Sequence, residues 1–143
     1  MTVELIFPLS GIVTPEQVKQ IVVAKTELVT AKHLAHLTGK NVPTTSAILS
    51  GWKKSQTALV LKHQGLNQCP LYTLNPANSF RPYPAMKEII SILEPKMGPW
   101  QMTFWFMCST NYLGGKTPRE LLAIDPELVI RSAHDEVLGG LHG

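Results

Sequence analysis

The amino-acid sequence predicts a mainly α-helical protein that contains one small β-hairpin. Apolar residues recur at helical spacing in several segments, and several of these segments begin at a proline that follows a capping residue. One stretch near the middle of the chain has the pattern of two short strands around a glycine-containing turn. With 143 residues, of which 44% are hydrophobic, the chain can bury about two-thirds of its unfolded surface, in one compact unit or two small ones.

The first two helices are predicted from their capping residues. Thr14 is a candidate N-cap, with Pro15 at the first helical position and Gln17 three residues after the cap, as in a capping box. Thr30 is the candidate cap of a second helix, and Gly39 supplies the conformation that ends it.

A third helix is predicted over residues 44–55. Ala47, Ile48 and Trp52 are expected to face inward, with Thr45, Ser46, Ser50, Lys53 and Lys54 facing outward. Ala35, a glycine four residues later, and the apolar Ile48 in the next helix form the pattern of a helix-turn-helix. The intervening residues 40–43 predict a longer turn than in the tightest version of this motif.

A β-hairpin is predicted to follow. Residues 57–62 alternate as a strand, residues 63–68 form a polar turn containing Gly65, and residues 71–74 return as a second strand. A helix pair followed by a hairpin is the winged variant of the helix-turn-helix. Residues 1–75 are therefore predicted to form a winged helix-turn-helix module.

Basic charge is concentrated in this first module. The whole chain carries a net charge of +3, with a pI near 9.0. Residues 1–75 hold seven Lys against three Glu, a balance of 7 − 3 = +4, while residues 76–143 hold six Lys or Arg against seven Asp or Glu, a balance of −1. A basic half attached to a near-neutral half suits a protein that binds a polyanion.

The residue types on this module favour double-stranded DNA as the polyanion. Lysines neutralise phosphates, and hydroxyl or amide side chains bind phosphates or base edges. We expect helix 44–55 to lie in the major groove and hairpin 57–74 to lie against the backbone. Because residues 1–80 contain no arginine, moderate sequence discrimination is expected. The predicted DNA-binding residues are Lys40, Thr44, Thr45, Ser46, Ser50, Lys53, Lys54, Gln56, Lys62, His63 and Gln64.

The second half of the chain is predicted to be a helical bundle joined by a linker. Residues 76–84 contain three prolines and predict a stiff extended connector. Residues 85–143 are then predicted to form a helical module, with an apolar stripe in its first helix and an almost wholly apolar second helix over residues 100–108. Thr117-Pro118 and Asp125-Pro126 start two further helices, through Leu122 and Val137.

This second half also resembles a known family. The shared elements are the apolar helix with Trp105, the turn with Asn111, Leu113, Gly114 and Gly115, the helix start with Thr117, Pro118, Leu121 and Leu122, and a last helix after Asp-Pro. From about Pro82 onward, the chain is similar to the toxin-binding domain of the Xre/MbcA/ParS-like antitoxins of bacterial toxin–antitoxin systems.

The resemblance implies an antitoxin, or a stand-alone regulator descended from one. Family members usually join this domain, which holds a toxin often of the RES-domain class, to a helix-turn-helix that represses their own operon. That DNA-binding part is commonly all-helical, whereas a wing is predicted here, so the resemblance applies to the C-terminal half. The residues expected to bind a partner are Asn111, Leu113, Gly114, Gly115, Lys116 and Arg119. The alternative is that Gly114-Gly115 only connects two helices.

No catalytic, metal or cofactor site is predicted. His33 and His36 share a helix face, but no Cys or carboxylate lies at ligand spacing. Residues 114–117 lack the first glycine of a phosphate-binding loop, and no nucleophile elbow is present. Cys69 and Cys108 are expected to be reduced thiols. No signal peptide or membrane span is predicted, which indicates a cytoplasmic protein.

Taken together, these patterns predict a homodimeric, sequence-selective DNA-binding transcription regulator of antitoxin type, and not an enzyme. A dimer is expected because a short palindromic DNA site has two half-sites, and each needs one bound subunit. Two alternatives remain. One is a protein-interaction adaptor whose winged helix does not bind DNA, and the other is a stand-alone phage or plasmid regulator that has no toxin partner.

Overall fold

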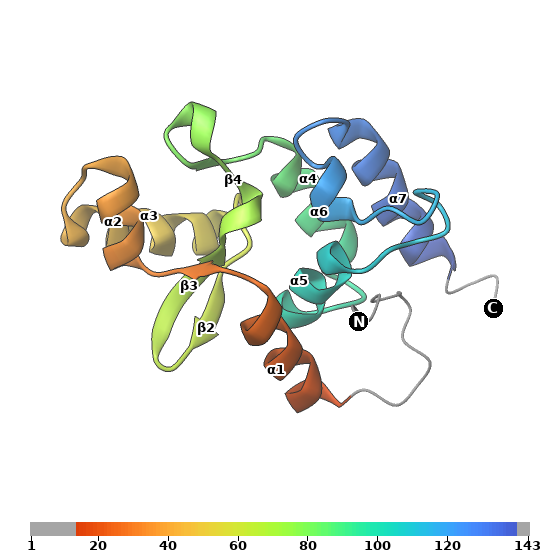
Figure 1. Cartoon of the computed structure of the whole chain (residues 1–143), viewed down its shortest axis with the longest axis horizontal. Helices are drawn as coiled ribbons and strands as arrows, with labels where there is room; N and C mark the ends of the chain where they lie inside the picture. The colour runs from red at the N-terminus through yellow and green to blue at the C-terminus, as the bar shows by residue number, and fades with distance from the viewer. Residues whose placement is uncertain (1–13, 140–143) are drawn as a thin grey trace.

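The computed structural model describes residues 14–139 and is mainly helical, with small antiparallel sheets (Figure 1). Residues 1–13 and 140–143, the outer ends of the two predicted modules, lie outside the described residues. The first half contains α1 (Pro15–Lys25), β1 (Leu28–Val29), α2 (Ala31–Thr38), α3 (Val42–Ser55), β2 (Leu61–His63) and β3 (Leu66–Pro70). The second contains β4 (Leu74–Asn75), β5 (Arg81–Pro82), α4 (Ala85–Leu93), α5 (Pro99–Met107), α6 (Pro118–Leu121) and α7 (Pro126–Gly139).

Side-chain caps start the first two helices as predicted. The Thr14 hydroxyl accepts the Gln17 backbone N–H at 3.2 Å, and the Gln17 side chain accepts the Thr14 N–H at 2.9 Å, which completes a capping box. Thr30 caps α2 by accepting the His33 N–H. Gly39 ends α2 in the left-handed region, at φ 75°.

Helix α3 starts earlier than predicted. Its N-cap is Asn41, whose side-chain oxygen accepts the Thr44 N–H at 2.8 Å, and Val42 is the first helical residue. Pro43 fits here because the N–H it lacks would have no partner in the first turn of a helix. The predicted longer turn over residues 40–43 is therefore wrong, since only residues 39–41 separate α2 from α3.

The hairpin is tighter than predicted and belongs to a three-stranded sheet. Strand β2 pairs antiparallel with β3, and β3 also pairs with β1, which gives the order β1-β3-β2. Gln64 and Gly65 make the turn with φ values of 50° and 78°, as in the two-residue turns that match strand twist. The predicted strand 71–74 is wrong: Leu71–Thr73 form a 3₁₀ turn, held where the Leu71 N–H donates to the Glu27 carbonyl oxygen at 2.9 Å.

The prolines of residues 76–84 do not produce an extended linker. Strands β4 and β5 pair antiparallel and enclose the 3₁₀ turn Pro76–Asn78, so the segment folds back on itself. The Asn75 side chain accepts the Ala77 N–H, and the Asn75 carbonyl oxygen accepts the Phe80 N–H. The predicted connector is thus a compact turn, because these local hydrogen bonds stabilise it.

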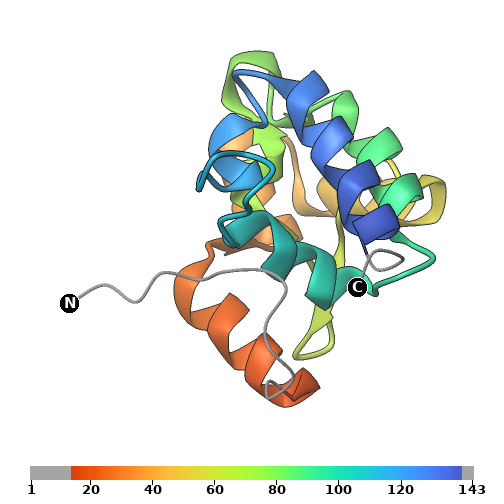
Figure 2. The ribbon, with the colours of Figure 1, turned by 90° about the vertical axis from the view of Figure 1, so that its right-hand side faces the viewer.

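The C-terminal helices follow the prediction closely. Helix α5 is almost wholly buried, and α7 packs along α4 (Figure 2). The Thr117 hydroxyl accepts the Glu120 N–H at 3.2 Å and caps α6, and the Asp125 carboxylate accepts the Leu128 N–H at the start of α7. Within residues 14–139, no helix has the length and apolar character needed to span a membrane.

Two buried clusters form the core, and the larger one crosses the predicted module boundary. The smaller cluster lies around α2, α3, β1 and β3 and includes Leu34, Leu49 and Cys69. The larger cluster contains side chains of α4, α5, α6 and α7, together with Val22 of α1 and Leu61 of β2. Helix α1 packs along α5, as Figure 2 shows. Val22, the buried side chain of α1, therefore packs with the C-terminal helices and ties the first half of the chain to the second.

We predict that Leu61→Ala lowers the free energy of unfolding by about 2–5 kcal/mol, because the side chain is fully buried in the larger core. Leu66→Ala in the same hairpin is the control, since Leu66 is 56% exposed and its truncation should change stability by less than about 0.5 kcal/mol. Urea denaturation followed by tryptophan fluorescence and far-UV circular dichroism measures both. Equal losses in the two variants would contradict the placement of Leu61 in this core.

Candidate nucleic-acid interface and partner turn

Helix α3 has one buried side and one exposed side. Thr45 and Leu49 are buried, and Ile48 and Trp52 are half-buried. Successive residues of an α-helix are rotated by about 100°, so a different set of residues lies on the opposite, exposed side. That outward face of α3 consists of the exposed residues Pro43, Ser46, Ala47, Ser50, Gly51 and Lys54. The prediction that Ala47 faces inward is wrong.

Thr45 is not available to DNA, which corrects its prediction as a DNA-binding residue. Its side chain is completely buried, and its hydroxyl donates to the Ala31 carbonyl oxygen at 2.7 Å. The Asn41 and Val42 carbonyl oxygens also lie within 3.2 Å of this hydroxyl. Thr45 therefore joins the first turn of α2 to the first turn of α3.

The other polar residues predicted on α3 and the hairpin, except His63, are exposed, but they do not all share one face. Lys54 belongs to the outward face of α3. Lys53 lies about 100° around the helix and lines a cavity of about 500 Å³ together with Gln56 and Glu94. The remaining exposed residues of the predicted set are Lys40, Thr44, Ser46, Ser50, Lys62 and Gln64.

His63 packs against the C-terminal half of the molecule. Its ring is half-buried and lies 5.7 Å from the Trp100 ring in an edge-on arrangement. The Lys19 ammonium lies 5.7 Å from the centre of the same tryptophan ring. Trp100 thus contacts both α1 and the hairpin, and only the turn residues Gln64 and Gly65, with Leu66, are exposed at the hairpin tip.

A long segment of the chain has no negatively charged side chain. Residues 28–87, from β1 to the start of α4, contain no Asp or Glu. Their cationic residues are all exposed, and neither of the two ion pairs within residues 14–139 involves them. They are Lys32, Lys40, Lys53, Lys54, Lys62, Arg81 and Lys87.

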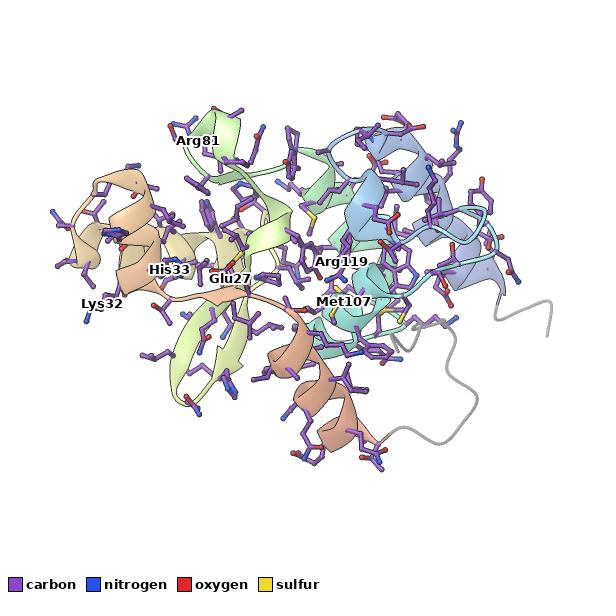
Figure 3. The ribbon with its side chains drawn as sticks, in the orientation of Figure 1. Glu27, Lys32, His33, Arg81, Met107 and Arg119 are labelled. Carbon is purple, nitrogen blue, oxygen red and sulfur yellow. The ribbon has the colours of Figure 1, made fainter. Side chains whose placement is uncertain are left out.

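The charge balance of residues 1–75 does not reveal this carboxylate-free segment, because Arg81 and Lys87 lie beyond residue 75. A scan for the longest stretch without a carboxylate would have found both residues. Figure 3 shows Lys32 on α2 and Arg81 on β5 at the end of the molecule away from α7. Most of the segment lies in the half of the molecule that carries α2 and α3, and its last residues begin α4, which packs against α7 (Figure 1).

The Gly114-Gly115 segment forms a closed turn between α5 and α6. The Gly115 N–H donates to the Thr110 carbonyl oxygen at 3.0 Å, and the Thr110 N–H donates to the Lys116 carbonyl oxygen at 3.2 Å. Both glycines have positive φ, 65° and 86°, a conformation that glycine adopts readily because it has no Cβ.

Not every residue of this turn can contact a partner. Leu113 is only 6% exposed and packs in the larger core, so its prediction as a partner-binding residue is wrong. Its N–H is also held by the Thr110 side chain. Arg119 is half-buried. Of the predicted set, the exposed members are Asn111, Gly114, Gly115 and Lys116.

Both cysteines are free, buried thiols. Burial raises the pKa of Cys69 to about 12, although a side-chain contact with Thr73 opposes this shift. Burial likewise raises the pKa of Cys108 to about 12, and the positive charge of Arg119 opposes it. Neutral, enclosed thiols are poor nucleophiles. Within residues 14–139, no three His, Cys, Asp or Glu side chains are grouped as metal ligands would be.

Comparisons with protein-family models, with curated proteins and with solved structures found no match for this chain. The antitoxin resemblance of the C-terminal half therefore stays a prediction from its sequence.

Thr45→Val should lower the free energy of unfolding by about 1–2 kcal/mol, because valine keeps the shape but loses the hydroxyl that donates to Ala31. Thr44→Val is the control, since Thr44 is exposed and no hydrogen bond of its hydroxyl is found. Thermal and urea denaturation measure the difference. A Thr45→Val protein as stable as the parent would contradict the role of this hydroxyl in joining α2 to α3.

Gly115→Ala should lower the free energy of unfolding by about 1–2 kcal/mol, because φ at this position is 86° and L-residues other than glycine are strained there. Gly51→Ala in α3 should instead raise it by about 0.5–1 kcal/mol, because φ is helical. An added Cβ meets no atom within 4 Å at either site, so packing does not differ. Denaturation curves that moved in the same direction would contradict the assigned backbone geometry.

Proposed function

We propose that this protein is a cytoplasmic, homodimeric, sequence-selective DNA-binding regulator of antitoxin type that represses its own operon. In this proposal the first half acts as a winged helix-turn-helix, and the C-terminal helices bind a partner toxin. The protein is not an enzyme in this proposal.

The order of elements supports a winged helix-turn-helix. A helix, a short strand, two helices and a hairpin follow one another, and the first strand pairs with the last strand of the hairpin. In such proteins the third helix enters the major groove and the hairpin contacts the backbone. Gly39 ends α2, and the short connection from α2 to α3 that follows also supports this assignment.

The observation that carries the proposal is the carboxylate-free segment 28–87 with its seven exposed cations. Duplex DNA presents one negative charge per about 1.7 Å of its axis, so a carboxylate near the contact would be repelled. A segment that simply remained hydrated would have no need to exclude Asp and Glu over this length. Its composition therefore favours contact with a dense polyanion.

The outward face of α3 suits close approach to a groove. Ser46, Ala47, Ser50 and Gly51 are small, so the helix backbone can come near the base edges, and the two serine hydroxyls can donate or accept hydrogen bonds. Lys54, at the C-terminal end of this face, is in a position to neutralise a phosphate. Because α3 has no arginine, we expect hydroxyl contacts and DNA shape to contribute most of the sequence selectivity.

Exposed apolar residues support a protein partner for the C-terminal half. Ile124, between α6 and α7, is 78% exposed, Leu138 near the end of α7 is 53% exposed, and Tyr112 in the glycine turn is 44% exposed. Apolar side chains that gather in one exposed patch are typical of protein-docking surfaces, and in this proposal the toxin covers these three residues. Lys116 adds a cationic contact beside Tyr112. The same residues favour the second candidate, an adaptor that binds only protein, whereas a stand-alone phage or plasmid regulator would have no toxin partner.

Binding to a labelled duplex from the promoter region upstream of the gene tests the proposal by fluorescence anisotropy. We expect affinity to fall linearly with the logarithm of salt concentration, and Lys54→Gln to reduce that slope by about 1. Lys54→Glu should weaken binding by about 10-fold or more. Lys116→Glu is the matched control, since this exposed lysine lies in the C-terminal turn, and it should leave duplex affinity within about twofold.

Two results would contradict the DNA-binding part of the proposal. One is the absence of any salt-dependent duplex affinity, which would favour the adaptor. The other is a Lys54→Glu protein that binds as tightly as the parent, which would remove the outward face of α3 from the interface.

A further inference from the structure

A half-open cavity of about 470 Å³ lies between the α2–α3 pair and the segment that leads from β5 into α4. Its walls come from elements far apart in the sequence. Three aromatic side chains and three cationic side chains contribute to the lining, namely Trp52, Phe80, Tyr83, Lys40, Arg81 and Lys87.

We propose that this cavity binds a small aromatic oxyanion, that is, a planar ring that carries a carboxylate or a phosphate. The volume falls within the range of about 300–1,000 Å³ that is typical of small-molecule sites. Such sites are usually lined by apolar and aromatic side chains, with a few polar groups that orient the ligand. The cavity is separate from the outward face of α3, because no residue of that face lines it, although Lys40, Arg81 and Lys87 also belong to the carboxylate-free segment 28–87.

The aromatic side chains favour a ring as the body of the ligand. Trp52, Phe80 and Tyr83 are each only half-buried, so part of each ring remains available. No aromatic pair is formed between any two of them, since the ring pairs found within residues 14–139 join other residues. A planar ligand would supply the stacking partner that these three rings lack.

Phe80 lies at the cavity in a strained backbone conformation. Ser79 and Phe80 have φ values of 53° and 57°, a conformation that residues other than glycine rarely adopt. The surrounding hydrogen bonds maintain it, because the Phe80 N–H donates to the Asn75 carbonyl oxygen and β4 pairs with β5 on both sides of the turn. Strain of this kind is concentrated at ligand sites and active sites.

The cations favour an oxyanion as the head of the ligand. Lys40 lies on the α2–α3 wall of the cavity, Arg81 and Lys87 lie on the β5–α4 wall, and no Asp or Glu lines it. All three are exposed at its rim and take no part in the ion pairs of residues 14–139. The Arg81 guanidinium has the planar geometry that binds a carboxylate or a phosphate with two parallel hydrogen bonds. An oxyanion would therefore neutralise charge that the cavity itself leaves uncompensated.

Neither half of such a ligand explains the cavity alone. An inorganic anion would leave the three rings in water, and a neutral ring would leave the three cations without a counter-charge. The ring and the oxyanion are therefore required in one molecule. Because its walls come from α2 and α3 on one side and from β5 and α4 on the other, the ligand would bridge the two halves of the chain.

Isothermal titration calorimetry with the full chain tests this inference. Phenyl phosphate and benzoate are the probes, and inorganic phosphate and benzyl alcohol represent the two halves of the ligand. We expect saturable binding of one molecule of phenyl phosphate or benzoate per chain, at least 10-fold tighter than either half. Binding of only one of the two probes would support the site and identify its head group.

Substitutions of cavity residues test whether the probe binds in this cavity. Arg81→Gln should weaken it by at least 10-fold, and Tyr83→Leu should weaken it while the protein stays folded by circular dichroism. Lys62→Gln is the matched control, since this exposed lysine lies on β2 outside the cavity lining, and its affinity should not change. In ¹⁵N-resolved spectra, the shifts should be largest over residues 79–87.

Three results of the binding measurements would overturn the inference. They are the absence of saturable binding by both probes, equal affinity for benzyl alcohol, and an Arg81→Gln protein that binds as the parent does. Shifts confined to the outward face of α3 would also overturn it, since they would place the anion on the proposed DNA surface.

Discussion

Helix α5 is the buried element on which the arrangement of the rest of the chain depends. Helix α1 packs along α5. Trp100, in the first turn of α5, contacts both Lys19 and His63. The Tyr72 hydroxyl donates to the Thr103 carbonyl oxygen at 3.0 Å, which ties the segment after β3 to the same helix. The hairpin therefore takes its position from the C-terminal half of the chain. In the proposed function, the helices that bind a protein partner also determine where the hairpin meets DNA.

In the proposed function, the distribution of charge along the chain matches the division between DNA binding and partner binding. Residues 28–87 carry seven Lys or Arg and no carboxylate, a balance of +7. Residues 88–139 carry four Lys or Arg against seven Asp or Glu, a balance of 4 − 7 = −3. A molecule with one basic end approaches a polyanion in a preferred orientation, because its field steers the encounter. The acidic end, which carries Ile124 and the glycine turn, would then remain free for a protein partner.

Local signals in the sequence predicted several helix boundaries well. Thr14, Thr30 and Thr117 cap the helices expected of them, because a capping hydrogen bond joins residues only three apart in the chain. The strand predicted over residues 71–74 failed for the opposite reason. Its backbone is held by Glu27, far away in the sequence, and pairing with β1 extends only to Pro70.

The sequence by itself determined the starts of α1, α2, α6 and α7, and that basic charge is concentrated in the first half of the chain. Only the tertiary structure decided which side of each helix is covered. Thr45 has the polarity of a surface residue, yet it is buried because the Ala31 carbonyl oxygen of a neighbouring helix offers it a hydrogen bond. Whether a polar side chain meets water, a ligand or its own backbone depends on partners that sequence spacing does not specify.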